Sequence, residues 1–268
     1  MTFTLNLNYR WQGKEDGPVL VLINGLLTDL SSWASHLAAY TDHYRVLTYD
    51  CRGQGGSDKP DDGPYLPQQH AHDLKALLDS QNVTHAALLG VSNGAIVALQ
   101  FAVNWPDRVD ALILANGYGR ADTALKVKLN SWLAGMAAGG GPLRFDVATP
   151  WVWGASFLNK AYEALKPFRE KGSALPVHAV RNLIAGGMEF DVLEQAANIT
   201  CPTLLMTGDE DVLTPLSYSH DLQRRIRGSQ IVMLREAGHC MFLEQPAAFT
   251  RAAAEFLHRT LPPTEAVP

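Results

Sequence analysis

The chain has 268 residues, of which 47% are hydrophobic and 18% are charged, and its formal net charge is -5. This composition is typical of a globular protein with one large domain, with or without an insertion. The negative charge supplies no basic surface for nucleic acid or for an anionic membrane, so we expect neither as a partner.

The N-terminal stretch, the apolar runs and the cysteines indicate in which cellular compartment we expect the protein. The opening stretch MTFTLNLNYRWQGK has no basic region followed by an apolar core, so it does not resemble a signal peptide. No apolar run is long enough to cross a bilayer. Cys51, Cys201 and Cys240 are widely spaced and form no C-x-x-C pair, which favours reduced thiols over disulfides or a zinc site. We therefore expect a cytoplasmic protein.

The predicted strands begin with residues 3–13, whose partly alternating pattern favours an antiparallel strand at a sheet edge. Six short runs rich in Val, Ile and Leu follow. They are residues 18–24, 44–50, 85–91, 110–117, 201–208 and 229–236. Most are apolar at consecutive positions, as in the strands of a parallel sheet that is covered on both faces.

Segments with helical periodicity lie between these strands. They are residues 31–40, 67–82, 95–105, 215–228 and 245–261. The alternation of strands and helices predicts an α/β fold with a doubly wound, mostly parallel sheet. His70 and His72 are two apart on one predicted helix and face different directions, so we expect no metal site there.

One interval, residues 119–200, interrupts the alternation. It contains no convincing strand and is rich in Trp, Phe, Met, Ala and Gly. A structureless loop of this length is implausible, so we interpret it as a helical cap over the carboxyl ends of the strands. The alternative is a packing layer without substrate contact. The predicted core is then residues 1–118 and 201–261, and residues 262–268 are expected to be a disordered tail.

The stretch GVSNGA places Ser92 between Gly90 and Gly94, directly after a predicted strand and before a predicted helix. A nucleophile on such a sharp turn needs neighbours with almost no side chain, because the backbones approach closely. The helix N-terminus adds N–H groups where an oxyanion would form. Ser92 is therefore the predicted nucleophile.

Serine needs a base, and two later loops supply the partners in the order Ser, Asp, His. The loop after residues 201–208 contains Asp209 and Asp211, and the loop after residues 229–236 contains His239. At the same edge of the sheet as Ser92, His239 can accept the serine proton, and an aspartate can orient the imidazole.

At this point the chain resembles the α/β-hydrolase family over nearly its whole length. The matching segments are INGLL (23–27), YDCRGQGGSDKP (49–60), GVSNGA (90–95), MTGDEDVLTP (206–215) and EAGHCMFLEQP (236–246). The resemblance implies the α/β-hydrolase fold, with the cap inserted after the sixth strand. It also implies a triad of Ser92, His239 and Asp211, and it selects Asp211 over Asp209, which stays as the alternative.

The resemblance further implies an oxyanion hole formed by the backbone N–H groups of Leu26 and Asn93. The family commonly has His where this chain has Asn24, and we expect Asn24 to shape the loop by hydrogen bonds. The Asn93 amide either points into the pocket or caps the helix. Serine rather than aspartate at position 92 is unlike the dehalogenase and epoxide-hydrolase branches, whose nucleophile is a carboxylate.

Asn24, together with Trp132 and Trp153 of the expected cap, is our candidate for substrate contact, although cap aromatics also serve as core residues of a helical layer. Arg144 and Arg181 are able to pair with a substrate carboxylate, but we interpret both as solvated charges.

These features predict a serine hydrolase that cleaves a small carboxylic ester or lactone through an acyl-enzyme, without metal or cofactor. The alternatives are a carbon–carbon bond hydrolase of a vinylogous diketone, an acyltransferase or perhydrolase on the same triad, and a non-catalytic small-molecule receptor. The oligomeric state stays open.

Overall fold

The computed structural model describes residues 5–261 and contains a seven-stranded sheet in the order β1-β3-β2-β4-β5-β6-β7. The strands are β1 (Tyr9–Gly13), β2 (Val19–Ile23), β3 (Arg45–Tyr49), β4 (Ala86–Val91), β5 (Val109–Ala115), β6 (Thr203–Gly208) and β7 (Gln230–Leu234). β1 pairs antiparallel with β3, and the other neighbouring pairs run parallel. The predicted antiparallel edge and the six predicted parallel strands are confirmed.

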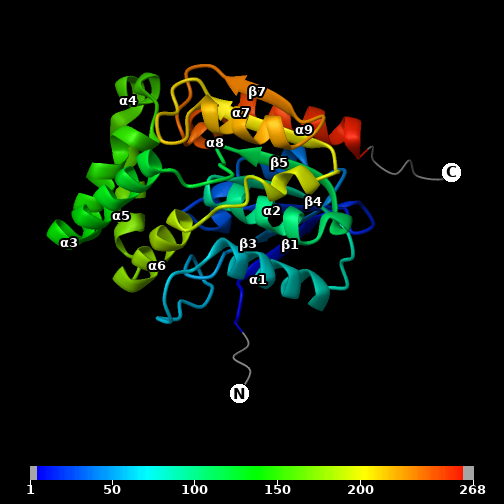
Figure 1. The fold of residues 1–268 in the computed structure, drawn as a ribbon, viewed down its shortest axis with the longest axis horizontal. Coiled ribbons are helices and arrows are strands. Elements are labelled where there is room, and N and C mark those ends of the chain that lie inside the picture. The colour runs from blue at the N-terminus through cyan, green and yellow to red at the C-terminus, as the bar shows by residue number, and fades with distance from the viewer. Residues whose placement is uncertain (1–4, 262–268) are drawn as a thin grey trace.

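Helices cover both faces of this sheet (Figure 1). Successive side chains of a strand point to opposite faces, so an apolar strand contributes to two cores. Val21 of β2 packs in one core with α1 (Pro67–Ser80) and α2 (Asn93–Asn104). Leu20 of the same strand packs in the other core with α9 (Pro246–Thr260). The α/β class predicted from the sequence is the observed one.

The remaining helices of the core complete the two layers. They are η1 (Leu30–Trp33), η2 (Leu37–Ala39), η3 (Pro106–Arg108), α7 (Leu216–Arg225) and α8 (Met241–Glu244). The helix predicted over residues 31–40 is wrong, since this segment forms the two short 3-10 helices η1 and η2. The Ser31 N–H and the Ser32 hydroxyl both donate to Asp29, and such local bonds compete with an α-helical ladder.

A group of helices between β5 and β6 lies at one end of the molecule, drawn in green in Figure 1. It contains α3 (Thr123–Val152), α4 (Ala155–Ala161), η4 (Tyr162–Leu165), α5 (Lys166–Ser173) and α6 (Val177–Met188). The short helix η5 (Gln195–Asn198), just before β6, instead packs against α2 and α7. An isolated bridge between Arg120 and Asp191 closes its base. α3 is two helices joined at a kink, where Gly140 has φ 67°.

This group follows the fifth strand of the sheet, so the expectation that it follows the sixth is wrong. The strand segments predicted from the sequence already place residues 119–200 after the fifth of them, and the count of six came from the family resemblance alone. The tail predicted over residues 262–268 lies outside the described residues. Within residues 5–261, no helix combines the length and the apolarity needed to span a membrane.

The burial of two histidines predicts how the free energy of unfolding changes with pH. His70 of α1 is 2% exposed and both ring nitrogens lack a hydrogen-bond partner among residues 5–261. Burial lowers the pKa of His70 to about 3 and the pKa of His36 to about 4. Both rings therefore stay neutral in the folded protein at a pH where the unfolded chain takes up protons.

We expect the free energy of unfolding to fall by about 3 kcal/mol from these two groups between pH 6.5 and pH 5. The stability is present above the unfolded pKa and is lost as the pH falls toward the folded value. Urea unfolding at pH 6.5 and at pH 5 measures this decrease in the free energy of unfolding. We expect His70→Leu to remove about half of the decrease. His72→Leu, on the exposed side of the same helix, is the control. An unchanged pH dependence in His70→Leu would contradict the prediction.

Candidate active site

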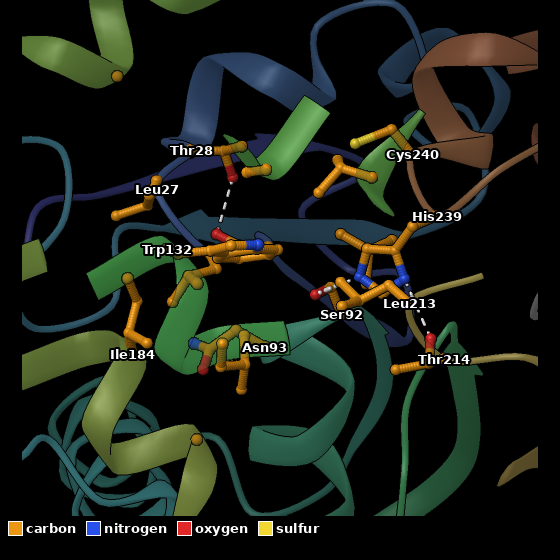
Figure 2. A pocket seen from close by; sticks show the side chains of 18 of the residues that line it. Leu27, Thr28, Ser92, Asn93, Trp132, Ile184, Leu213, Thr214, His239 and Cys240 are labelled. Atoms are coloured by element: carbon orange, nitrogen blue, oxygen red, sulfur yellow. Dashed lines mark hydrogen bonds between the residues drawn. The ribbon is translucent and has the colours of Figure 1, made fainter. Parts of the chain in front are cut away.

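Ser92 lies on the turn between β4 and α2, where its backbone has φ 52° and ψ -114°. Positive φ is unusual for a residue with a side chain and is found where the surrounding structure enforces it. Here the Ser92 N–H donates to Ala115 O of β5 over 2.8 Å, which ties the turn to the neighbouring strand. The Ser92 side chain consequently points into a cavity (Figure 2).

The two glycines around Ser92 are required by close backbone contacts. A Cβ added to Gly90 would lie 2.2 Å from Gly94 O, and a Cβ added to Gly94 would lie 2.1 Å from Ile23 O. These distances are far below van der Waals contact, and the neighbouring atoms are backbone that cannot move aside. The spacing G-x-S-x-G therefore has the steric origin that the sequence indicated.

The structure brings Ser92, His239 and Asp211 together at the carboxyl ends of β4, β7 and β6. His239 Nε2 lies 2.8 Å from Ser92 Oγ, and His239 Nδ1 lies 2.9 Å from Asp211 Oδ2. Figure 2 shows the imidazole of His239 beside Ser92. His239 is 7% exposed and Asp211 is 4% exposed, so the imidazole and the carboxylate are shielded from water.

The Asp211 carboxylate is held by several donors. Its Oδ1 accepts the backbone N–H groups of Leu213 and Thr214, each over 2.9 Å. Its Oδ2 lies 2.9 Å from the Thr214 hydroxyl, which is also 3.0 Å from His239 Nδ1. Thr214 therefore supports both partners. The motifs in the sequence did not indicate Thr214, although a threonine three positions after an aspartate is a recurrent local hydrogen-bonding pattern.

Asn116, at the end of β5, fixes the loop that carries His239. It has φ 51°, and its Nδ2 donates to His239 O over 2.6 Å and to Gly238 O over 3.3 Å. Its own carbonyl oxygen lies 3.1 Å from the Thr214 hydroxyl. Asn116 thus joins the loops after β6 and β7, a role that no motif in the sequence indicated.

Leu26 and Asn93 are the residues expected to supply the N–H groups of the oxyanion hole. Both residues line the cavity, and neither N–H donates to another group within residues 5–261. A Cβ on Gly25 would lie 3.6 Å from Ser92 Cβ, so the loop after β2 passes directly beside the turn after β4. β2 and β4 are neighbouring parallel strands, which is why their carboxyl ends meet.

A cavity of about 150 Å³ contains Ser92 and His239, and most of its walls are apolar side chains from α3, α6 and the loops of the core. Trp132 and Trp153, the predicted substrate contacts, both line it and are 4% and 6% exposed. The Asn93 Nδ2 group is buried there without a partner among the described residues. Asn93 lines the cavity, and its Nδ2 makes no hydrogen bond within residues 5–261 that would cap the helix.

Asn24 is not among the lining residues of this cavity, and the prediction of a substrate contact at Asn24 is corrected. Its Nδ2 donates to Thr28 O over 2.8 Å, and the side chain is fully buried. Asn24 instead fixes the loop that presents Leu26, as the alternative role foresaw. The side chain is too short to bond across the loop and also reach the cavity.

The two arginines considered earlier differ from each other. Arg181 is exposed and pairs with Asp61 over 3.1 Å, in agreement with a solvated charge. Arg144 is 4% exposed and lines the cavity, so its interpretation as a solvated charge is wrong. The kink in α3 turns the helix after Gly140 and brings the Arg144 side chain inward.

Two glutamates join the helices after β5 to the loops after β6 and β7. Glu210 Oε2 accepts the Ser156 N–H over 2.8 Å. Glu244 Oε2 accepts the Gly238 N–H over 2.8 Å and the Gly154 N–H over 3.1 Å. Burial raises the pKa of Glu244. The helices over the cavity are thus attached directly to the loop that carries the active-site imidazole.

Comparison with known proteins agrees with this architecture. The α/β hydrolase fold family matches residues 18–246. The chain is 32% identical to 3-oxoadipate enol-lactonase 2 of Acinetobacter baylyi, covering 94% of this chain and 93% of that protein. It is 29% identical to a putative carbamate hydrolase RutD of a Caulobacter species, covering 90% and 91%.

A solved structure, the enol-lactonase of Burkholderia xenovorans LB400, superposes with a TM-score of 0.84 at 28% identity, covering 94% of this chain and 96% of that one. The family match extends from β2 to α8 and includes the loops that carry Ser92, Asp211 and His239. The chain therefore belongs to the α/β-hydrolase family of enzymes.

Proposed function

We propose that the protein is a serine hydrolase that cleaves a small carboxylic ester or lactone through an acyl-enzyme intermediate. One observation carries the proposal: Ser92 Oγ, His239 and Asp211 form a continuous hydrogen-bonded relay, with contacts of 2.8 and 2.9 Å, at the wall of an apolar cavity. A hydroxyl, an imidazole and a carboxylate in this order constitute an activated nucleophile.

In the first half of the reaction, Ser92 Oγ attacks the carbonyl carbon and its proton passes to His239 Nε2. Asp211 stabilises the imidazolium and keeps the ring in the tautomer that has its proton on Nδ1. The N–H groups of Leu26 and Asn93 bind the tetrahedral oxyanion. Such donors each contribute about 10²- to 10³-fold to the rate in serine hydrolases.

In the second half, His239 returns the proton to the leaving oxygen as the carbon–oxygen bond breaks, which leaves the acyl group on Ser92. His239 then accepts a proton from water, whose oxygen attacks the acyl carbon. Collapse of this intermediate releases the carboxylic acid and restores the Ser92 hydroxyl. From a lactone, the alcohol and the acid leave as one hydroxy acid. No metal or cofactor enters these steps.

The size and lining of the cavity support a small substrate. A volume of about 150 Å³ accommodates one benzene-sized group. The relatives named as enol-lactonases support a lactone, whereas the relatives named as putative carbamate hydrolases favour a carbamate as the second candidate. Because Ser92 would attack the carbonyl of a lactone or of a carbamate in the same way, an activity assay must compare these two substrate classes.

We also propose that residues 119–200 act as the cap of this site and that the protein is cytoplasmic. The cap is supported by Trp132 and Trp153, which line the cavity that contains Ser92. The location is supported by the cysteines, all three of which are free thiols.

The proposal predicts burst kinetics with 4-nitrophenyl esters. We expect one equivalent of 4-nitrophenolate in the burst, and kcat/KM at least about tenfold higher for the acetate and butyrate than for the octanoate, because added methylenes overfill the cavity. Stopped-flow absorbance measures both. A 4-nitrophenyl N-methylcarbamate in the same panel tests the second candidate. Absence of both burst and turnover for every compound would instead indicate a receptor that binds without catalysis.

A further inference from the structure

Arg144 has an unusual position for a cation. It lies on the second half of α3, its side chain is 4% exposed, and it lines the same cavity as Ser92 and His239. Its guanidinium lies beside Gly172 of α5, where an added Cβ would come 3.1 Å from Nη2. The glycine leaves the space that the guanidinium occupies.

No group within residues 5–261 pairs with this cation. Arg144 makes no hydrogen bond or ion pair to them, and its Nε is enclosed without a partner. Two cations on α5 are paired elsewhere, Arg169 with Asp146 over 2.8 Å and Lys171 with Asp29 over 2.6 Å, and Glu170 of the same helix forms no ion pair with Arg144. Burial lowers the pKa of Arg144 to about 10, so the guanidinium stays charged at neutral pH.

A buried cation without a counter-ion costs free energy, and proteins rarely contain one unless a partner arrives. Two residues that line the same cavity also carry donors without a partner among the described residues, namely the Trp132 indole N–H and the Asn93 amide. Figure 2 shows Trp132 and Asn93 bordering the space in front of Ser92. The cavity therefore offers several donors, one of them charged, within otherwise apolar walls.

We propose that the substrate of this site carries a carboxylate, and that Arg144 binds that carboxylate while Ser92 attacks the ester or lactone carbonyl at the other end. This rests on the proposed function. The guanidinium presents parallel N–H groups that match a carboxylate in two-point fashion. Because the cavity is small, only a short spacer separates the carboxylate from the reacting carbonyl.

Arg144 is a substrate-binding residue in this proposal and takes no part in proton transfer. Its carboxylate contact fixes which end of the molecule enters first and so presents the carbonyl to Ser92. A neutral molecule of the same shape would leave the cation buried and unpaired, so the site binds it more weakly than the anion. Selectivity for an anionic substrate follows from the unpaired charge.

The test measures binding without turnover in the Ser92→Ala background. The probes are a γ-lactone with a carboxymethyl substituent, 5-oxotetrahydrofuran-2-acetic acid, and the corresponding neutral carboxamide. We expect the acid to bind about 30-fold or more tightly than the amide by calorimetry. In the Ser92→Ala background, Arg144→Met should abolish the preference for the acid over the amide, whereas Arg144→Lys should retain part of this preference. Arg181→Met, which changes an exposed arginine of α6, is the matched control.

In the enzyme with Ser92 intact, kcat/KM should be higher for the lactone acid than for its carboxamide. The difference should arise mainly from a lower KM for the acid. Arg144→Met should lower kcat/KM for the acid about 30-fold or more, and should lower kcat/KM for the neutral carboxamide much less. We expect Arg144→Met to be at least as stable as wild type, since it removes an uncompensated charge.

Equal binding of acid and amide, or a preference for the acid that survives Arg144→Met, would overturn the proposal. Because binding is measured without turnover, this result is independent of the hydrolase proposal. Failure of the hydrolase proposal would show instead as absence of the burst with 4-nitrophenyl esters.

Discussion

Ser92→Ala is expected to lower kcat for a turned-over 4-nitrophenyl ester by about 10⁴- to 10⁶-fold. The hydroxyl is the only atom that would form the acyl bond, and a methyl group in its place leaves His239 Nε2 without the proton donor now 2.8 Å away. The residual rate should come from the N–H groups of Leu26 and Asn93 and from binding alone. Initial rates with the 4-nitrophenyl butyrate of the burst assay measure the loss.

His239→Ala provides the control for this result. Residues that act as one unit show non-additive effects, so the Ser92→Ala/His239→Ala double variant should be about as slow as either single variant. Ser92→Ala should remain folded, since alanine removes one oxygen and the turn is held by backbone bonds and by Gly90 and Gly94. Ester hydrolysis at the wild-type rate in Ser92→Ala would remove this serine from the mechanism.

Asp211→Asn is expected to lower kcat by about 10³- to 10⁴-fold through the wrong imidazole tautomer. Oδ1 of Asp211 accepts the N–H groups of Leu213 and Thr214, so the carbonyl oxygen of an asparagine would take that position. Its amide nitrogen would then face His239 Nδ1, now 2.9 Å from Oδ2. The ring would place its own proton on Nε2, where it cannot accept the proton of the serine.

Asp209→Asn is the matched comparison, because it neutralises the other acid considered in the same loop. The Asp209 carboxylate accepts the Ala237 N–H over 3.3 Å and has no contact with His239. We expect its kcat to stay within about threefold of wild type. Steady-state kinetics of both variants with one ester show which aspartate orients the imidazole of His239. A large loss in Asp209→Asn together with a small one in Asp211→Asn would transfer the orienting role to Asp209.

Local chemistry explains which features could be predicted from the sequence. The turn at Ser92 needs Gly90 and Gly94 because of contacts within a few residues and with the adjacent strand, so its signature is written in one short segment. The parallel strands were predicted because each is apolar on both faces. The helix over residues 31–40 was wrong, since Asp29 offers local hydrogen bonds that periodicity does not register.

Other features depend on contacts between distant segments. The burial of Arg144 requires the kink after Gly139 and the space beside Gly172 on another helix. Helical periodicity identifies an amphipathic face but does not specify which neighbouring segment packs against it. This is especially true where a kink interrupts the helix. For the same reason, nothing in the sequence indicated that Asn116 would hold the loop of His239.

By itself the sequence determined the order of strands and helices and the loops in which Ser92, Asp211 and His239 stand. It could do so because every parallel strand ends at the same edge, so residues that follow such strands gather there. The tertiary structure alone decided the distances within the relay, the lining of the cavity and the isolation of the Arg144 charge. These depend on how separate segments pack through space, which local residue patterns do not specify.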